Sequence, residues 1–494
     1  MFKYTVYAKH PKGKINREIY GNFSEHIGKG IYEGIYVGEG SDIPNQAGMR
    51  TDVVNALKEM KLPVLRWPGG WFADEYHWMD GIGPKESRKR TVNVQWGGVT
   101  EDNSFGTHEF LELCEQIGCE PYISANVGSG TVQEMAEWIE YMTFDGDSTM
   151  ANLRRKNGRE KPWKIKYFGI GNESWSGGGY MSADYYADCY RRYRTYCRNY
   201  GTNQLYRIAC GGGSNGEDCD WTETLMRRAS SRMEGLSVHY YAKLDGKRYR
   251  NLAAEFSPEE WYATLKQALR IEQVIEAHAA SMDKYDPEKR VGMIVDEWGT
   301  WFDVEEGTEP LFLYQQNTMR DALVAAVSLN IFNKHCDRVK MANIAQLANV
   351  LQAVVLTEGE KMVLTPTYYA FLLYKYHQDS TLLESTIETC EIGQQEHTVV
   401  NLHESASVDA EGNIHITVCN LSHAQTYEID TEIVSAELGD IRAEILTGAM
   451  NAHNTFEEMD KVGVQTFTDY QMKDGHILLK IPACSVLHLE IRNA

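Results

Sequence analysis

The feature of this sequence that most restricts its fold is an alternation that runs from residue 18 to residue 375. Short apolar runs alternate there with longer segments whose apolar residues recur at helical spacing. This order is typical of a parallel sheet with helical crossovers. Eight parallel strands are the number that closes a (β/α)₈ TIM barrel. We therefore predict an α/β barrel over residues 18–375, with strands at 18–25, 63–67, 121–126, 165–172, 207–210, 235–240, 291–297 and 340–346.

The segments between these runs predict the outer helices of the barrel. The clearest start signal is Ser257-Pro258-Glu259-Glu260, which combines an N-cap serine, a proline at the first helical position and acidic residues in the first turn. The apolar spacing predicts helices at 49–60, 107–117, 132–142, 183–200, 260–282 and 316–336.

Beyond residue 380 the sequence changes to strand-like runs without long helical periods. Examples are residues 412–420, 427–434, 476–481 and 487–491. Such a series predicts a C-terminal antiparallel β-sandwich, which we expect to be jelly-roll-like. The opening run at 3–7 is also strand-like and could pair into the sandwich. We therefore predict a second domain made of residues 1–17 plus 376–494.

The overall charge disfavours several classes of partner. The 494 residues include 70 acidic and 49 basic side chains, a formal net charge of −21, and no long run of lysine and arginine. A nucleic-acid partner is therefore not expected. No long apolar stretch predicts a membrane span, and the N-terminus lacks the apolar core of a signal peptide. We expect a soluble, cytoplasmic protein.

Metal and cofactor sites leave recognisable patterns of ligands or glycines in a sequence. The ten cysteines contain no CxxC pair and no spacing to histidine that suits zinc, and there is no HExxH motif. The Gly211-Gly212-Gly213 run lacks the spacing of a phosphate-binding loop. We expect no metal and no other cofactor.

Polar side chains end most of the predicted barrel strands. In a (β/α)₈ barrel the catalytic groups lie at the C-terminal ends of the strands. Glu173 and Glu297 are the strongest candidates, because a carboxylate that follows a strongly apolar strand is costly to bury unless it is paired or functional. For His26 or Asn126 alone, the alternative that a polar residue merely ends a strand stays open. The other candidates are Glu25, Arg66, Asn172, His239, Tyr241 and Gln346.

Two carboxyl groups at the mouth of one barrel suit the hydrolysis of a glycoside. One protonated carboxyl donates to the leaving oxygen, and one ionised carboxylate faces the anomeric carbon. Groups about 5 Å apart allow direct attack with retention of configuration, whereas a gap of roughly 6.5–9.5 Å admits water and gives inversion. A donor such as Arg66 or Tyr241 beside Glu297 would favour its ionised form.

Five further blocks occur in order along the chain. They are Leu65-Arg66-Trp67-Pro68-Gly69-Gly70, Gly169-Ile170-Gly171-Asn172-Glu173-Ser174-Trp175, Ser237-Val238-His239-Tyr240-Tyr241, Val295-Asp296-Glu297-Trp298 and Met341-Ala342-Asn343-Ile344-Ala345-Gln346-Leu347. In order and spacing they resemble the signature blocks of the family 51 α-L-arabinofuranosidases, and the resemblance covers nearly the whole chain.

The resemblance implies roles for individual residues. Glu173 would be the general acid/base and Glu297 the nucleophile of a double displacement, and Asn172 would bind the sugar 2-hydroxyl. The remaining members, which would hold the furanose ring or orient the nucleophile, are Glu25, Arg66, Tyr241 and Gln346. The resemblance also implies a homo-oligomer, either a hexamer or another multimer.

One position departs from the family pattern. After Pro68-Gly69-Gly70 the family usually has an asparagine or cysteine that faces the site, whereas this chain has Trp71. Trp71, and likewise Trp96 and Trp301, could stack on the apolar face of a sugar or simply fill space in the core. We name Trp71, Trp301 and His239 as further candidate substrate-binding residues.

The sequence therefore predicts a retaining, exo-acting glycoside hydrolase that releases terminal α-L-arabinofuranosyl groups from arabinan or arabinoxylan oligosaccharides. The nearest alternative is another retaining glycosidase on the same barrel, such as an endoglucanase or a β-xylosidase, because a carboxylate pair does not choose the sugar. A metal-dependent barrel hydrolase and a non-catalytic sugar-binding protein are more distant alternatives.

Overall fold

A closed barrel forms the larger part of the computed structural model, which describes residues 1–213 and 218–493. Eight parallel strands follow one another around the ring in chain order, and each predicted run is confirmed as one of them. The strands are β2 (Gly21–Phe23), β5 (Val64–Trp67), β8 (Glu120–Ala125), β9 (Tyr167–Ile170), β10 (Tyr206–Ala209), β11 (Gly235–Ala242), β12 (Gly292–Thr300) and β13 (Val339–Ala345).

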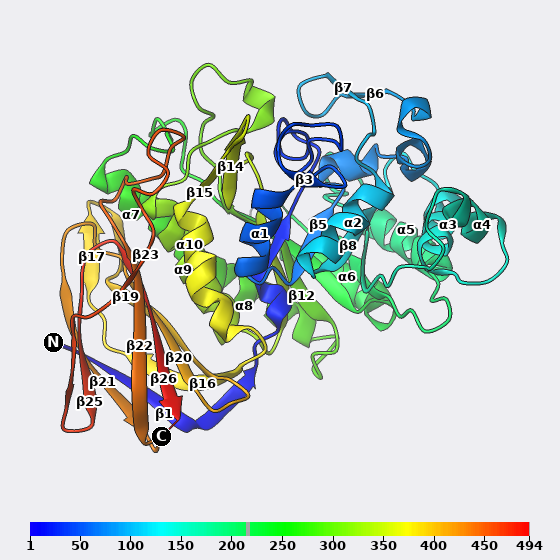
Figure 1. Cartoon of the computed structure of the whole chain (residues 1–494). Coiled ribbons are helices and arrows are strands. Elements are labelled where there is room, and N and C mark those ends of the chain that lie inside the picture. The colour runs from blue at the N-terminus through cyan, green and yellow to red at the C-terminus, as the bar shows by residue number, and fades with distance from the viewer. Residues whose placement is uncertain (214–217, 494) are drawn as a thin grey trace.

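Helices surround the ring (Figure 1), and the predicted ones are present, the one at 107–117 with its predicted bounds and the others with one or both ends shifted. The start signal at Ser257 is confirmed, because its hydroxyl accepts a hydrogen bond from the Glu260 N–H at the beginning of α7. The predicted helix 260–282 is instead two helices that meet at Arg270. The helices are α1 (Thr51–Glu59), α2 (Thr107–Ile117), α3 (Val132–Thr143), α4 (Thr149–Lys156), α5 (Ala183–Tyr196), α6 (Cys219–Ala229), α7 (Pro258–Leu269), α8 (Ile271–Asp283), α9 (Met319–Lys334) and α10 (Pro366–Tyr374).

The second domain is the predicted β-sandwich, built around one ten-stranded sheet. The strand β1 (Phe2–Lys14) lies inside this sheet, antiparallel to β16 (Thr381–Ile387) and parallel to β21 (Tyr427–Val434). The expected pairing of the N-terminal segment is therefore confirmed, and Figure 1 shows β1 in blue beneath the orange strands. The remaining strands are β19 (Leu402–Val408), β20 (Ile414–Asn420), β22 (Leu438–Thr447), β23 (Val464–Thr466), β24 (Tyr470–Lys473), β25 (His476–Ile481) and β26 (Ser485–Asn493).

Helix α9 joins the two domains. Every residue of α9 except Lys334 is buried. One side of the helix packs on β12 of the barrel, and the other packs on β19, β20 and β26 of the sandwich. A helix that is covered on all sides belongs to a core rather than to a surface, so the sandwich is fixed against the barrel and is not a loosely tethered module.

Two hairpins rise from the C-terminal end of the barrel, at the top of Figure 1. One pairs β6 (Thr91–Asn93) with β7 (Val99–Glu101), and the other pairs β14 (Val355–Glu358) with β15 (Lys361–Leu364). Trp96 lies between β6 and β7, and Leu351 lies shortly before β14; both line the pocket described below. The hairpins therefore wall the mouth of the barrel. Further short pairs are β3 (Asn45–Gln46) with β4 (Met49–Arg50), and β17 (Glu391–Gln394) with β18 (His397–Val400).

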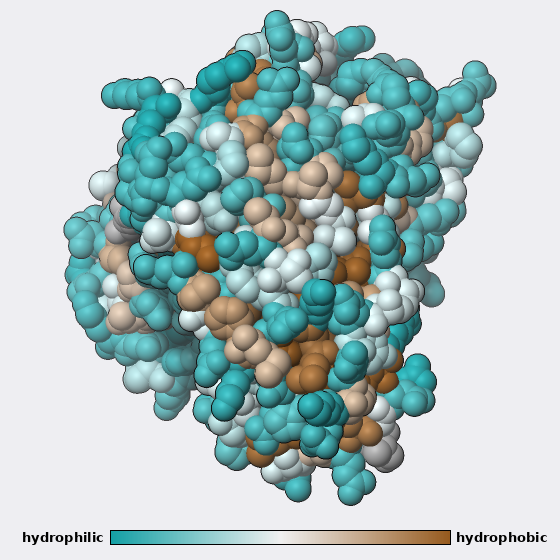
Figure 2. Space-filling view, turned by 90° about the vertical axis from the view of Figure 1, so that its left-hand side faces the viewer, coloured by the Kyte–Doolittle hydropathy of each residue, from teal (hydrophilic) through white to brown (hydrophobic). Residues whose placement is uncertain are grey.

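The outer surface that lies on the left of Figure 1 is mostly hydrophilic. Figure 2 shows this face, where apolar residues gather in the central and lower part. Scattered apolar atoms are normal on a protein surface. Within residues 1–213 and 218–493, no helix combines the length and the apolar character that crossing a bilayer requires.

Candidate active site

The geometry of β12 aims two consecutive carboxylates into the barrel. Neighbouring side chains of a regular strand point to opposite faces. The pairing of β12 with β11 shifts by one residue between Ile294 and Glu297, and its pairing with β13 shifts by one residue between Met293 and Ile294 and back again between Val295 and Trp298. A β-bulge of this kind re-aims side chains and is frequent beside active sites. Asp296 and Glu297 both turn inward as a result, and Arg66 contacts their carboxylates at 3.7 Å and 2.9 Å.

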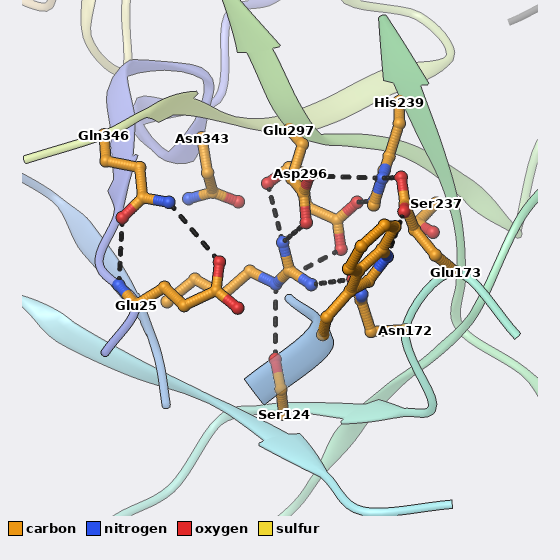
Figure 3. Close-up of polar contacts among 12 residues, drawn as sticks. Glu25, Ser124, Asn172, Glu173, Ser237, His239, Asp296, Glu297, Asn343 and Gln346 are labelled. Atoms are coloured by element: carbon orange, nitrogen blue, oxygen red, sulfur yellow. Dashed lines mark hydrogen bonds and ion pairs between the residues drawn. The ribbon is translucent and has the colours of Figure 1, made fainter. Parts of the chain in front are cut away.

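Glu173, Glu297 and His239 converge at the mouth of the barrel (Figure 3). Carboxylate oxygens of the two glutamates and a ring nitrogen of His239 all lie within 4.8 Å of one another. The Nδ1 of His239 is 2.9 Å from Glu173 Oε1 and 3.4 Å from Glu297 Oε2. Glu173 itself has a φ of 39°, a conformation that non-glycine residues seldom adopt and that recurs at functional sites. The turn after β9 thus presents its carboxyl group to the one on β12.

Arg66 of β5 is buried and orients three neighbours. Its Nη1 donates to Glu297 Oε1 at 2.9 Å, its Nη2 to Asn172 Oδ1 at 2.6 Å, and its Nε to Ser124 Oγ at 3.2 Å. The Nδ2 of Asn172 is also buried and has no hydrogen-bond partner in the part of the chain that the structure describes. Buried donors normally have partners. The free Nδ2 is therefore a suitable contact for a ligand hydroxyl.

Burial and the neighbouring positive charges shift the pKa of Glu297 in opposite directions. Burial raises the pKa of Glu297, His239 and Arg66 lower it, Glu173 adds to the rise, and the net change is upward. We expected donors beside Glu297 to favour its ionised form. Arg66 and Tyr241 do contact it, the latter through its hydroxyl at 3.0 Å from Oε2, but burial outweighs the lowering by the positive charges.

His239 is a cation held between carboxylates. Burial lowers its pKa, but the charge of Glu297 and hydrogen bonds to Asp296 and Glu173 raise it to about 10. The Nε2 of His239 lies 3.0 Å from Asp296 Oδ1, and the Tyr122 hydroxyl donates to Asp296 Oδ2 at 2.7 Å. Burial raises the pKa of Asp296, yet Arg66 and His239 bring it below its usual value. Asp296 therefore stays ionised and keeps His239 protonated.

Two stacked tryptophans form another wall of the site. The rings of Trp71 and Trp96 lie 5.7 Å apart with 17° between their planes. The Nε1 of Trp71 donates to Glu173 Oε2 at 2.6 Å, and the Nε1 of Trp96 donates to Glu25 Oε1 at 3.1 Å. Each ring lines the pocket and also orients a carboxyl group. The sequence suggested that these rings either stack on a sugar or fill space in the core. Their role in orienting a carboxyl group was not predicted.

Glu25 can gain or lose a proton near neutral pH. It accepts hydrogen bonds from the Phe72 N–H at 2.9 Å and from Gln346 Nε2 at 3.4 Å. Burial and the charge of Glu297 raise its pKa to about 7. A carboxyl group in this range can donate to a ligand hydroxyl or accept from one.

All ten predicted site residues come together. Arg66, Asn172 and His239 connect to the others through the contacts described above. The remaining seven line a pocket of about 60 Å³, and they are Glu25, Trp71, Glu173, Tyr241, Glu297, Trp301 and Gln346. The ring of Trp301 meets the ring of Tyr241 edge-on at 5.1 Å.

Some positions differ from the prediction. His239, Tyr241 and Glu297 lie inside β11 and β12 rather than at their ends, because both strands continue beyond the predicted limits. His26 does not line the pocket; its ring nitrogens contact Glu101 and Trp67. Asn126 does not line it either, since its side chain accepts from the Ser129 and Gly130 N–H groups of its own loop.

Several residues of the site carry no prediction from sequence. Tyr122 could have been found, because it lies on β8 two residues before Ser124, and alternate residues of a strand share a face. The apolar residues Ile27, Leu313 and Leu351 also line the pocket. They come from loops, where apolar side chains give no signal of function.

The described residues hold two groups of three side chains that could approach one metal ion. One is Glu173, His239 and Glu297, and the other is Glu272, Glu276 and His335. Sequence motifs did not indicate the first group, because its members come from three separate strands or loops. Both ring nitrogens of His239 already contact carboxylates, so a metal would have to displace one of these contacts.

The chain is similar over nearly its whole length to known proteins. It is 52% identical, over 491 residues, to an intracellular exo-α-L-arabinofuranosidase of Bacteroides ovatus; the match covers 99% of this chain and 95% of the relative. Its fold matches the crystal structure of the GH51 arabinofuranosidase from Xanthomonas axonopodis pv. citri with a TM-score of 0.97, at 43% identity and over 100% of both chains.

The chain belongs to the family 51 α-L-arabinofuranosidases. Residues 56–243 match the family model described as the α-L-arabinofuranosidase 1 domain. Residues 296–485 match the family model described as the α-L-arabinofuranosidase C-terminal domain. The α-L-arabinofuranosidase of Thermotoga maritima, solved as an arabinose complex, is 30% identical with a TM-score of 0.87 and is covered over 99% of both chains. The family assignment made from the five blocks is confirmed.

Proposed function

We propose that this protein is an exo-acting α-L-arabinofuranosidase that releases terminal α-L-arabinofuranosyl groups from arabinan or arabinoxylan oligosaccharides with retention of configuration. The observation that carries the proposal is the approach of two carboxyl groups, those of Glu173 and Glu297, to within 4.8 Å at the mouth of the barrel. Retaining enzymes place such groups about 5–5.5 Å apart, whereas inverting enzymes need roughly 6.5–9.5 Å to admit a water molecule.

In the first step Glu297 is the nucleophile and Glu173 the general acid. An oxygen of the Glu297 carboxylate bonds to the anomeric carbon while the bond from that carbon to the glycosidic oxygen breaks. The proton of the Glu173 carboxyl passes to the departing oxygen, so the leaving group departs as a neutral alcohol. The product of this step is a covalent arabinosyl ester of Glu297.

In the second step the roles of Glu173 reverse. Its carboxylate takes a proton from a water molecule, whose oxygen bonds to the anomeric carbon as the ester bond to Glu297 breaks. Arabinose leaves with its original anomeric configuration, because the carbon has been inverted twice. His239, as a cation near both carboxyl groups, limits the repulsion between them when both are ionised.

The surroundings of the carboxyl pair support binding of one furanose ring. The free Nδ2 of Asn172 beside Glu173 suits the sugar 2-hydroxyl, and Glu25 with Gln346 suits further hydroxyls. Trp71 and Trp301 are among the side chains that line this small pocket of about 60 Å³. A pocket of this size supports removal of terminal groups rather than cleavage inside a chain.

Product stereochemistry on an aryl α-L-arabinofuranoside tests the sugar and the mechanism together. We expect proton NMR during turnover to show the α-anomer of arabinose first, with the β-anomer appearing only by mutarotation. Initial formation of the β-anomer would contradict direct attack by Glu297. Aryl glucosides and xylosides serve as comparison substrates, and faster hydrolysis of either would favour an endoglucanase or a β-xylosidase.

Three further proposals concern the whole protein. We place it in the cytoplasm, which the intracellular relative from Bacteroides ovatus supports. We divide it into a barrel domain of residues 18–375 and a sandwich domain of residues 1–17 plus 376–494, which the pairing of β1 with β16 supports. We expect a homo-oligomer, a hexamer or another multimer, from the family resemblance; sedimentation analysis tests this expectation.

A further inference from the structure

A second cavity of about 300 Å³ lies beside the active-site pocket. It is bordered by the β14–β15 hairpin at the top of Figure 1, through Thr357 and Glu358, and by the loop between β12 and α9, through Phe312 and Tyr314. Phe456 completes the border and comes from the sandwich domain, in the segment between β22 and β23. Both domains therefore build this cavity.

The cavity and the active-site pocket share their walls. Three loop segments each give one residue to the active-site pocket and another, one or two positions away, to the second cavity. The pairs are Ile27 and Lys29, Leu313 and Phe312, and Leu351 and Asn349. The two hollows are therefore neighbours that share the same three loop segments in their walls.

The wall between them is fixed rather than loose. A Cβ built on Gly28 would lie 2.7 Å from Phe312, and one built on Gly97 would lie 2.6 Å from the Phe312 ring, so this ring fills the space between the two glycines. Asn349 and Thr357, which also line the second cavity, are held together by two hydrogen bonds. Asn349 Oδ1 accepts from the Thr357 N–H at 2.8 Å, and Asn349 Nδ2 donates to Thr357 Oγ1 at 2.8 Å. A preformed site loses little freedom when a ligand binds.

Hydrogen bonds beside the cavity hold the segment that carries Phe456 against the β14–β15 hairpin. Lys361 Nζ donates to the Phe456 carbonyl at 3.1 Å, and Asn454 Nδ2 donates to the Leu364 carbonyl at 2.9 Å. Tyr314 and Phe456 pack as partly buried rings on the small apolar core of Ala353, Leu356 and Val363. The two rings are therefore held in place while part of each stays accessible.

The chemistry of the lining suits a neutral sugar. Aromatic rings pack well on apolar CH surfaces, and the Tyr314 hydroxyl makes no hydrogen bond within the described residues. Glu309 and Glu358 at the rim supply acceptors for hydroxyl groups, and the ammonium of Lys29 is paired with Glu33 at 2.7 Å. The balance of charge at the rim is negative, which disfavours an anionic ligand.

We propose that this cavity binds the neutral oligosaccharide chain from which the terminal arabinofuranosyl group is removed. The proposal rests on the proposed function, because the active-site pocket holds the terminal sugar and the remainder of the glycan must lie outside it. Binding there would favour longer substrates, and it assigns to the sandwich domain a direct part in substrate selection through Phe456.

Two variants that alter the cavity in opposite ways test the proposal. Phe456→Ala removes an aromatic wall, and Glu358→Trp fills the space from the exposed end of β14. We expect each to raise the KM for an α-1,5-linked arabinopentasaccharide about fivefold or more while the KM for an aryl α-L-arabinofuranoside changes less than about twofold. Tyr196→Ala, which removes an exposed ring at the end of α5, is the matched control and should alter neither constant.

Equal effects on both substrates, or no effect on either, would overturn the assignment of the cavity. Binding of the pentasaccharide to Glu297→Gln, measured by calorimetry with and without Phe456→Ala, gives a second readout that needs no turnover. If the wild-type protein does not hydrolyse the aryl arabinofuranoside, the proposed function fails. A loss of pentasaccharide affinity caused by Phe456→Ala would in that case still support the cavity, and unchanged affinity would reject it.

Discussion

The indole nitrogen of Trp71 lies 2.6 Å from Oε2 of Glu173, while the other oxygen of the same carboxyl group lies 2.9 Å from His239. Both oxygens of the proposed acid/base are thus held by donors from different elements. The family resemblance led us to expect an asparagine or cysteine at position 71, and the tryptophan that stands there supplies one of the two donors to Glu173.

Replacing Trp71 by phenylalanine keeps the ring against Trp96 but removes the N–H donor. We expect Trp71→Phe to lower kcat about tenfold on arabinofuranosides with poor leaving groups, because hydrogen bonds to charged groups contribute about 1.5–3 kcal/mol and proton donation there depends on the position of Glu173. Substrates with activated aryl leaving groups should be affected much less. A leaving-group series measures the difference. Trp96→Phe, which loses the bond to Glu25 instead, should change KM more than kcat.

Glu297→Ala should abolish turnover without unfolding the protein. The nucleophile has no substitute, since no other carboxylate stands opposite Glu173 with the same contacts to Arg66 and Tyr241 in the described part of the chain. We expect kcat to fall by more than about 10³-fold. Thermal melts followed by circular dichroism check the fold, and Glu360→Ala on the exposed hairpin is the control. Substantial residual activity would refute the role of Glu297.

Glu173→Ala should respond to added azide. The variant still forms the ester with an activated aryl arabinofuranoside, which needs no acid, but it lacks the base for the second step. Azide enters the space of the lost carboxyl and attacks the ester, so we expect partial recovery of rate and an arabinosyl azide product. The same addition should not rescue Glu297→Ala. Absence of rescue would count against Glu173 as the acid/base.

Chelation should leave activity unchanged. Glu173, His239 and Glu297 lie close enough for metal binding, but His239 is held as a cation by Asp296 and Glu173, and a protonated imidazole cannot ligate a metal. We expect full activity after dialysis against EDTA. Loss of activity that returns with added metal would favour the metal-dependent alternative.

The stability of the protein should fall as the pH drops below about 6.5, the usual pKa of histidine. His377 contacts Ser407 at 2.7 Å and Thr417 at 3.2 Å in the sandwich, and burial lowers its pKa to about 3. Between these two values the unfolded chain binds a proton that the folded chain does not, so unfolding is favoured by up to about 1.4 kcal/mol per pH unit. Denaturant titrations at pH 7, 6 and 5 measure this slope.

A variant at the same position separates this effect from general acid sensitivity. We expect His377→Gln to be less stable at pH 7 but to show a shallower decline with acid, because one of the buried histidines whose pKa is lowered on folding has been removed, while His108, His403 and His488 remain. The partly buried His453, whose ring contacts the Asn451 carbonyl, lies away from the His377 contacts, and His453→Gln controls for the exchange of a histidine for glutamine. An unaltered slope in His377→Gln would contradict the role of this histidine.

The strand order and the convergence of the site could be predicted, because both follow from local patterns. Apolar runs define the strands, closure of eight of them in chain order fixes the neighbours, and the ends of such strands meet at one mouth. The convergence of the ten candidate residues could therefore be predicted before any distance between them was known. The capping signal at Ser257 was equally local and equally reliable.

The remaining features depend on contacts between distant parts of the chain. The helical apolar spacing continues through Arg270, so the sequence pattern gives no sign that α7 ends there and α8 begins. The hydrogen bond from Trp71 to Glu173 joins residues that are 102 positions apart, and the net rise in the pKa of Glu297 depends on how deeply the folded chain buries it. None of these can be read from one segment.

Because β12 contains a bulge, the number of residues in this strand fixes the direction of the Glu297 side chain more strictly than the choice of apolar residues does. Valine, isoleucine and methionine can replace one another at residues 293–295 at moderate cost. Removing a single residue there would shift Glu297 by one position along the strand and turn the proposed nucleophile toward the outer helices. Natural variants of this segment should therefore differ by substitution and never by insertion or deletion.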